Sequence, residues 1–262
     1  MLSKSLGAGA NEHVGHGFMD HVSARVARFQ VSDWNLYRRA FAHRRRGGVR
    51  TTLKLVTTPA LVRRESVLPA YAHWEFDVQQ ASLRQLGRAR VTGEGIRRMP
   101  RELTQVADAT ARALVSGQRV LPQFATPYLR VDVEQPPRVS RSITWRPDPN
   151  DGHLDVVWDI SDAERASIKR VGVLATERIL NADCGVVSAT PIDSHEFVDT
   201  KHMMGGARMG REARDSVVDS DCQIHDLDGA WVAGASVFPS GGVANPTFTA
   251  LALADRMVQQ ID

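Results

Sequence analysis

The residues of this chain best suited to chemistry gather in its last third. His202 precedes a glycine-rich turn with Gly205 and Gly206, and Asn245 stands directly before Pro246 and an apolar run. A histidine works as a general base near neutral pH, and an asparagine amide both donates and accepts hydrogen bonds. Taken singly, such a histidine is more often structural, and Asn-Pro is usually only a helix cap. The spacing of the whole set decides between these interpretations.

That set forms an ordered motif: His202-Met-Met-Gly-Gly-Ala-Arg-Met-Gly210, Ser216-Val-Val-Asp219, Trp231-Val-Ala-Gly-Ala-Ser-Val-Phe-Pro239 and Asn245-Pro-Thr247. Its order and gaps closely resemble the C-terminal signature of the glucose–methanol–choline (GMC) flavoenzymes. Two further segments are similar to that family: Gly15-His-Gly-Phe-Met-Asp-His21, and Glu134-Gln-Pro-Pro137 followed by Ser140-Arg-Ser-Ile-Thr144. The resemblance thus spans nearly the whole chain, and it is vaguest between residues 30 and 125.

The resemblance implies an FAD-dependent oxidoreductase acting on the CH–OH group of an alcohol or sugar. Such a reaction removes a proton from oxygen and a hydride from carbon, and no side chain accepts a hydride, so a cofactor is required. By the resemblance, His202 is the base and Asn245 holds the substrate oxygen. The substrate itself and the electron acceptor (oxygen, a quinone or a cytochrome) stay open.

The resemblance also implies which residues face the flavin. The first turn of a helix beginning at Pro246 presents unpaired N–H groups and a partial positive charge, which suit the negative edge of reduced flavin. The expected cofactor-binding residues are Gly234, Ala235, Asn245, Pro246, Thr247 and Phe248. No metal site is expected, and the three methionines Met203, Met204 and Met209 are interpreted as packing beside the flavin.

The chain departs from the family in two places. Gly206 stands where the family commonly has a threonine, so any hydroxyl contact made there is absent. The strand, G-x-G-x-x-G turn and helix that bind the FAD pyrophosphate are also absent, and Gly7-Ala-Gly-Ala-Asn-Glu12 does not replace them, because Glu12 takes the place of the third glycine. We therefore expect a C-terminal half that needs an N-terminal FAD-binding half as its partner. The alternative is a non-catalytic fragment or subunit that does not bind flavin by itself.

The local patterns predict an α+β fold, in which an antiparallel sheet with flanking helices is joined to part of an FAD-binding α/β domain. Strands are expected near residues 24–31, 51–58, 71–78 and 229–236, a hairpin at 141–145 and 153–160, and helices at 102–116, 162–180 and from Pro246 onward. The box Ser161-Asp-Ala-Glu164 caps the second helix. In the last helix we expect the buried face to consist of Phe248, Leu251, Ala252, Met257, Val258 and Ile261. The expected division is a remnant of the FAD domain (1–22), a substrate domain (23–195) and a C-terminal FAD-domain segment (196–262).

Composition excludes several other classes of protein. The 33 Lys and Arg residues nearly balance 30 Asp and Glu, and the cluster Arg44-Arg-Arg46 lacks an aromatic platform, so a solvated loop is favoured over nucleic-acid binding. Cys184 and Cys222 fit neither a disulfide framework nor a zinc site, which favours reduced thiols and a cytoplasmic location. No apolar run is long enough to span a membrane. The histidines other than His202 are expected to be structural: His13, His16, His21, His43, His73, His153, His195 and His225.

Overall fold

A curled antiparallel sheet with helices is the centre of the molecule, which confirms the predicted α+β class. The computed structural model describes residues 11–41, 44–46, 49–77, 126–148 and 152–260. The six-stranded sheet runs in the order β10 (Val198–Asp199), β1 (His21–Val31), β6 (Thr126–Glu134), β5 (Ala70–Asp77) and β4 (Leu55–Val56), and β9 (Val186–Pro191) also pairs with β1. The predicted strands at 24–31 and 71–78 therefore exist, whereas the one at 51–58 is reduced to β4 and the end of β3 (Val49–Thr51).

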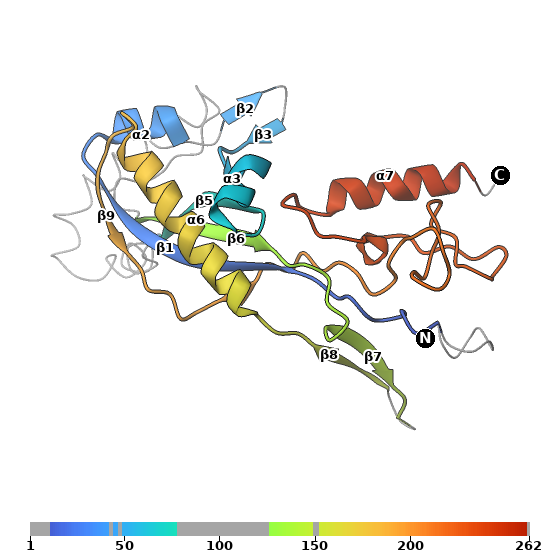
Figure 1. Cartoon of the computed structure of the whole chain (residues 1–262). Coiled ribbons are helices and arrows are strands. Elements are labelled where there is room, and N and C mark those ends of the chain that lie inside the picture. Colours follow the sequence, from blue (N-terminus) through green and yellow to red (C-terminus); the bar gives the residue numbers. More distant parts are fainter. Residues whose placement is uncertain (1–10, 42–43, 47–48, 78–125, 149–151, 261–262) are drawn as a thin grey trace, which may run out of the picture.

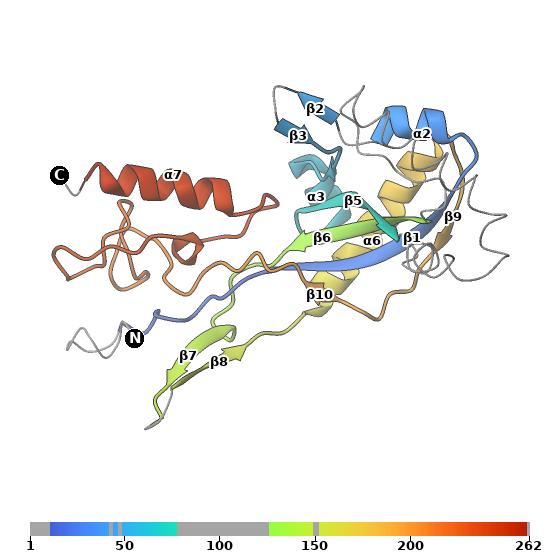
Figure 2. The same cartoon turned by 180° about the vertical axis from the view of Figure 1, so that it is seen from behind.

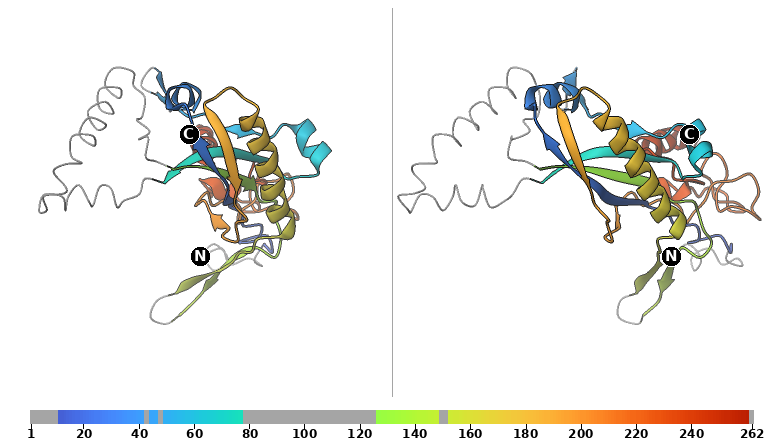
Figure 3. Two further views of the ribbon diagram at one scale, coloured as in Figure 1. Left: turned by 90° about the vertical axis from the view of Figure 1, so that its left-hand side faces the viewer. Right: turned by 60° about the vertical axis from the view of Figure 1, so that its left-hand side comes forward.

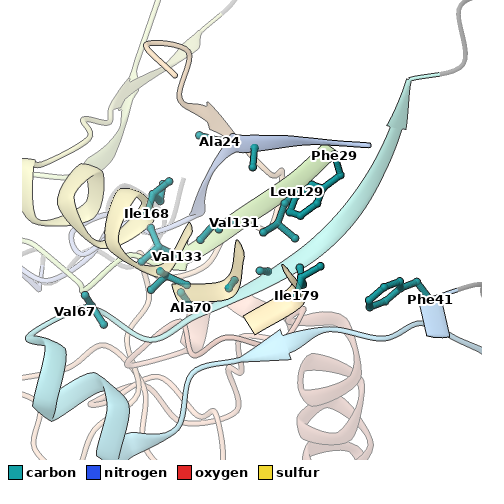
Figure 4. Close-up of a cluster of buried hydrophobic side chains, with 14 of the residues drawn as sticks. Ala24, Phe29, Phe41, Val67, Ala70, Leu129, Val131, Val133, Ile168 and Ile179 are labelled. Atoms are coloured by element: carbon teal, nitrogen blue, oxygen red, sulfur yellow. The ribbon is translucent and has the colours of Figure 1, made fainter. Parts of the chain in front are cut away.

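One face of this sheet is covered by helix α6 (Asp162–Leu180), whose predicted bounds and capping box are both confirmed (Figure 1). Side chains of alternate residues in β5 and β6 point to the same face, as the period of two requires. Val131 and Val133 of β6 pack against Ile168 of α6, as Figure 4 shows. This core fixes the strands on which the functional residues are carried.

Shorter elements surround the sheet. The predicted hairpin exists as β7 (Ser142–Arg146) paired with β8 (His153–Val157), and it projects from the body of the molecule (Figure 3). Elements that the sequence patterns did not predict are the helices α2 (Trp34–Phe41) and α3 (Pro59–Glu65) and the strands β2 (Arg44–Arg46), β6, β9 and β10. The backbone of 44–46 pairs with β3, so the expectation of an irregular loop there is wrong. The helix expected at 102–116 lies outside the described residues.

A second core joins the N-terminal segment to the C-terminal one. Met19, Met204, Val218 and Val237 are fully buried in it. Figures 1 and 2 place this region at the end of the sheet opposite to α2 and β9. The strand predicted at 229–236 is wrong, because Trp231 makes only an isolated bridge and residues Ala235–Val237 form the 3-10 helix η1.

The last helix, α7 (Thr247–Val258), differs from prediction at its start and in its orientation. Pro246 is the cap and the Asn245 side chain makes no capping bond, because the proline already adopts helical backbone angles. Three apolar residues of the predicted buried face point outward: Phe248 is 83% exposed, Leu251 64% and Val258 57%. Ala252 is also exposed, and Ile261 lies outside the described residues. Met257 packs on the second core as predicted, and it does so together with Ala250 and Leu253, which the prediction did not include.

Two smaller expectations concern the cysteines and the membrane. Cys184 and Cys222 are both free and buried, as the prediction of unpaired thiols requires. Among the helices that the structure describes, none is long and apolar enough to cross a membrane.

Candidate active site

His202 lies at the end of a short segment that Asp20 fixes to the start of β1. The backbone N–H of His202 and the hydroxyl of Thr200 both donate to Asp20 Oδ1, over 2.9 and 3.0 Å. Lys201, between them, has a left-handed φ of 62°, which is uncommon for a residue with a side chain. This turn allows the flanking residues to bind the same buried carboxylate. Gln135 holds the backbone of Asp20 in place, because Gln135 Oε1 accepts a hydrogen bond from the Asp20 N–H at 3.0 Å.

The imidazole of His202 is half-buried, and only one of its nitrogens forms hydrogen bonds with described residues of the chain. Its Nδ1 lies 2.8 Å from Thr200 Oγ1 and 3.1 Å from His21 Nδ1. The two imidazole rings meet edge to face, with centroids 5.2 Å apart. Nε2 of His202 makes no hydrogen bond to any residue in the part of the chain that the structure describes. The ring therefore presents one free nitrogen.

Burial, and next the proximity of His21, hold the pKa of His202 below its ordinary value of 6.5. Asp20 and Asp132 act in the opposite direction, and Lys54 adds to the lowering. The lowered pKa keeps the ring neutral at pH 7, which is the form that a general base requires.

His21 connects His202 to the glycine-rich loop before α7. It is only 1% exposed, and its Nε2 lies 2.7 Å from the carbonyl oxygen of Gly242. The N–H of Gly242 in turn donates to Glu134 Oε1 at 2.9 Å. Asn245 follows three residues later in the same loop. The structure thus connects His202 and the loop of Asn245 to the same buried histidine.

A second connection joins the predicted glycine turns. The N–H of Gly205 donates to the carbonyl of Ala235 at 3.1 Å, which brings the turn after His202 beside Gly234 and Ala235. Gly205 has no room for a side chain, because a Cβ there would meet the carbonyl oxygen of Gly17. Gly206 has a φ of 97°, a backbone angle at which a threonine would be strained. The backbone at Gly206 thus favours glycine over threonine in this chain.

The loop and the start of α7 line a cavity of about 360 Å³. Its walls include Phe238, Gly242, Asn245, Pro246 and Leu253. Asn245 is exposed, and its side chain makes no hydrogen bond with the described residues. The structure shows no contact between Asn245 and His202 among its described residues. Their joint action therefore stays a prediction.

The backbones of Gly234 and Gly242 have open space beside them. A Cβ at Gly234 or Gly242 would meet no atom within 4 Å, so nothing within the described chain fills the volume beside their backbones. The first N–H groups of α7 have no side-chain cap. Thr247 and Phe248 at this helix start are both exposed. Unpaired N–H groups at a helix N-terminus are suited to an anionic or electron-rich edge.

A polar cavity of about 330 Å³ lies on the face of the sheet that α6 does not cover. Thr200 lines it, together with His73, Glu75, Arg130 and Asp132. Burial would raise the pKa of Asp132, but the neighbouring His73, followed by hydrogen bonds from Ser23 and Tyr71, holds it at about 2. Arg130 Nη1 lies 2.8 Å from Glu75 Oε2. The wall of this cavity therefore carries both hydrogen-bond donors and acceptors beside Thr200.

Sequence reasoning missed several of these residues. His21 and His73 were expected to be structural, yet one contacts His202 and the other lines the polar cavity. The signal was present in Phe18-Met-Asp-His21, a segment that resembles the family and carries two polar residues. Three other histidines keep simple structural bonds: His13 to the carbonyl of Arg214, His16 to that of Val139, and His225 to the Ser216 hydroxyl. His153 and His195 lie on the surface, and His43 is outside the described residues.

Comparison with known proteins finds a family match for the C-terminal part of the chain. Residues 137–254 match the family described as GMC oxidoreductase. The large subunit of fructose dehydrogenase from Gluconobacter japonicus is 28% identical over 110 residues, which are 42% of this chain and 19% of that protein. A C-glycoside 3-oxidase from Arthrobacter globiformis is 41% identical over 61 residues, 23% of this chain and 12% of that protein.

The fold has solved relatives as well. An FAD-dependent oxidoreductase from Chaetomium thermophilum superposes with a TM-score of 0.51 and 15% identity, over 99% of this chain and 50% of that one. This chain thus corresponds to about half of that structure and to smaller parts of the two sequence relatives. Residues 137–254 thus match the C-terminal domain described as GMC oxidoreductase, and the likeness to the solved structure shows that the chain shares its fold.

Proposed function

We propose that this chain supplies the proton-accepting and substrate-facing part of an FAD-dependent enzyme that oxidises a CH–OH group to a carbonyl. The observation that carries the proposal is the free Nε2 of a half-buried, neutral His202. The substrate hydroxyl donates its proton to this nitrogen. GMC oxidoreductases are FAD-dependent, and the flavin when bound supplies the acceptor for the hydride.

Residues of the loop before α7 would hold the cofactor. The uncrowded backbones at Gly234 and Gly242 and the uncapped N-terminus of α7 support this assignment. Ala235, Pro246, Thr247 and Phe248 belong to the same two segments and are proposed to contact it. Asn245 is proposed to hold the substrate oxygen, because its unengaged amide offers both a donor and an acceptor.

The polar cavity supports a substrate with several hydroxyl groups, such as a sugar, a glycoside or a polyol. Each hydroxyl both donates and accepts, and the cavity wall offers carboxylates at Glu75 and Asp132 beside the donors of Arg130 and His73. A sugar, glycoside or polyol offers several hydroxyls to these groups, whereas a simple aliphatic alcohol offers only one. The two relatives named above agree with this class by name, since they act on fructose and on a C-glycoside.

A flavin-binding half is the proposed partner of the chain. The outward face of α7 carries Phe248, Leu251 and Val258, which are more exposed than an apolar stripe on a finished surface should be. The chain also spans only about half of the solved structure that it resembles. A second domain that contributes the dinucleotide site would cover this stripe.

The proposal is tested with the chain produced alone and together with an FAD-binding half. We expect the two visible absorption bands of flavin in the joint sample, and turnover on sugars and polyols above that on simple alcohols. His202→Gln should lower kcat by about 10²–10⁴-fold, the usual contribution of a general base. Asn245→Ala should lower kcat more than it raises KM.

The matched control is His195→Gln, because that histidine is exposed and lies outside the site. It should leave turnover unchanged. Flavin binding without turnover on any CH–OH compound would overturn the reaction. Absence of flavin from both samples would favour the alternative of a non-catalytic subunit.

A further inference from the structure

The hydrogen bonds around His21 decide which of its nitrogens carries a hydrogen. The carbonyl oxygen of Gly242 only accepts, so His21 Nε2, 2.7 Å away, is the donor. A neutral imidazole has one N–H, and therefore His21 Nδ1 holds a lone pair. This lone pair points at His202 Nδ1, 3.1 Å away. His21 is thus an acceptor toward His202.

The same reasoning applies to Thr200. Its hydroxyl donates to Asp20 Oδ1 at 3.0 Å, so that hydrogen is not available to His202. The Thr200 oxygen, 2.8 Å from His202 Nδ1, therefore accepts. Both neighbours of His202 Nδ1 are acceptors. All the bonds are satisfied together only when His202 carries its hydrogen on Nδ1 and leaves Nε2 bare.

We propose that Asp20, Thr200 and His21 form a relay that holds His202 in the Nδ1–H tautomer, and that His21 receives a proton when His202 takes one from substrate. The proposal rests on the proposed function for the direction of that proton. The substrate hydroxyl proton moves to His202 Nε2, and the hydrogen on His202 Nδ1 moves to His21 Nδ1. His202 ends neutral with an Nε2–H, and His21 ends as the cation, still donating to Gly242. Asp20, Thr200 and His21 are positioning residues in this scheme.

The surrounding charges favour a cation on the histidine pair. Asp20 is 2% exposed and receives the backbone N–H groups of both His21 and His202, so it cannot move away. Asp132 adds a second negative charge from β6, while Lys54 is the positive group that opposes it. A fixed buried carboxylate beside the pair stabilises the added proton without reorganisation.

The test uses ¹⁵N-labelled chain and long-range ¹H–¹⁵N correlations, which report the hydrogen on each ring nitrogen and need neither flavin nor turnover. The spectrum of His202→Gln assigns the His202 signals. We expect Nδ1–H at His202 and Nε2–H at His21 near pH 8. Thr200→Val should raise the share of the Nε2–H tautomer at His202, because His21 Nδ1 is then the one acceptor left of the two that face Nδ1. Thr200→Ser, which keeps the hydroxyl, should restore the Nδ1–H form.

Acid titration tests the second half of the proposal. The ring-nitrogen signals of His21 should change together with those of His202, because His21 Nδ1 lies 3.1 Å from His202 Nδ1. In His21→Asn the apparent pKa of His202 should rise, since the nearby His21 lowers it. An Nε2–H signal at His202 in the unaltered chain, or a His21 signal that stays fixed while His202 takes up a proton, would overturn the relay. Loss of turnover with these tautomers intact would instead contradict only the proposed function.

Discussion

The two faces of the central sheet are built from neighbouring residues of the same strands, yet they are opposite in character. Leu129 and Val131 of β6 point into the core under α6 and are at most 1% exposed. Arg130 and Asp132, which alternate with them, point to the other face and line the polar cavity. Because successive side chains of a strand point to opposite faces, one face of the sheet stabilises the core and the other presents charged side chains on the side of His202.

The polar face is organised by its own ion pairs rather than by packing. Arg25 binds Glu75 through two bonds of 2.6 and 3.1 Å, and Arg130 binds the same carboxylate. Arg130 Nε also donates to the Ser23 hydroxyl at 2.6 Å. The Arg–Glu pairs of this face are partly exposed, and each contributes about 0–1 kcal/mol to stability. The difference teaches that the fold depends on one face and the proposed function on the other.

The largest expected effect compares two adjacent residues of β6. Leu129→Ala should destabilise the chain by about 2–5 kcal/mol, because it leaves a cavity beneath α6. Arg130→Ala should cost about 1 kcal/mol or less, since Arg25 still pairs with Glu75. Urea unfolding followed by circular dichroism measures both. Equal losses for the two variants would show that the polar face stabilises the fold as much as the core does.

The next effect concerns Asp132 and pH. Its pKa is about 2 in the folded chain against an ordinary 3.8, so the folded state favours the ionised carboxylate. The resulting stability, about 2 kcal/mol, is fully present above pH 3.8 and is lost as the pH falls through 2. Asp132→Asn should flatten the dependence of unfolding free energy on pH between 5 and 2. Other carboxylates titrate in both proteins, so the difference between the two curves isolates this residue.

The sequence predicted those parts of the fold whose signals are local. The capping box at Ser161 and the pairing of β7 with β8 depend on signals within a few residues, and both were confirmed. The position of His202 at the site also came from a local motif. The role of His21 could not be predicted in this way, because its partner lies 181 residues away and only the fold brings the two rings together.

The buried face of α7 shows the same limit. The segment from Thr247 to Val258 is apolar on several sides, so the helical period fits more than one stripe. Contact with the second core selected Ala250, Leu253 and Met257, and no local rule distinguishes these from the outward stripe. The open face of α7 is thus apolar where the open face of the sheet is charged, and each suggests a different kind of occupant.

The smallest expected effect tests that contrast. Phe248→Ser should change the stability of the isolated chain by less than about 0.5 kcal/mol, because the ring is 83% exposed. Leu253→Ser, on the inward stripe, should cost about 1–3 kcal/mol, since it places a hydroxyl against the second core. Thermal unfolding measures both, and co-purification with an FAD-binding half measures docking. If the outward stripe is a covered surface in the assembled protein, Phe248→Ser weakens docking while the chain itself stays as stable as before. If Phe248→Ser changes neither stability nor docking, the outward stripe of α7 is ordinary surface. Of these two open faces, the charged face of the sheet would then be the one with a proposed role.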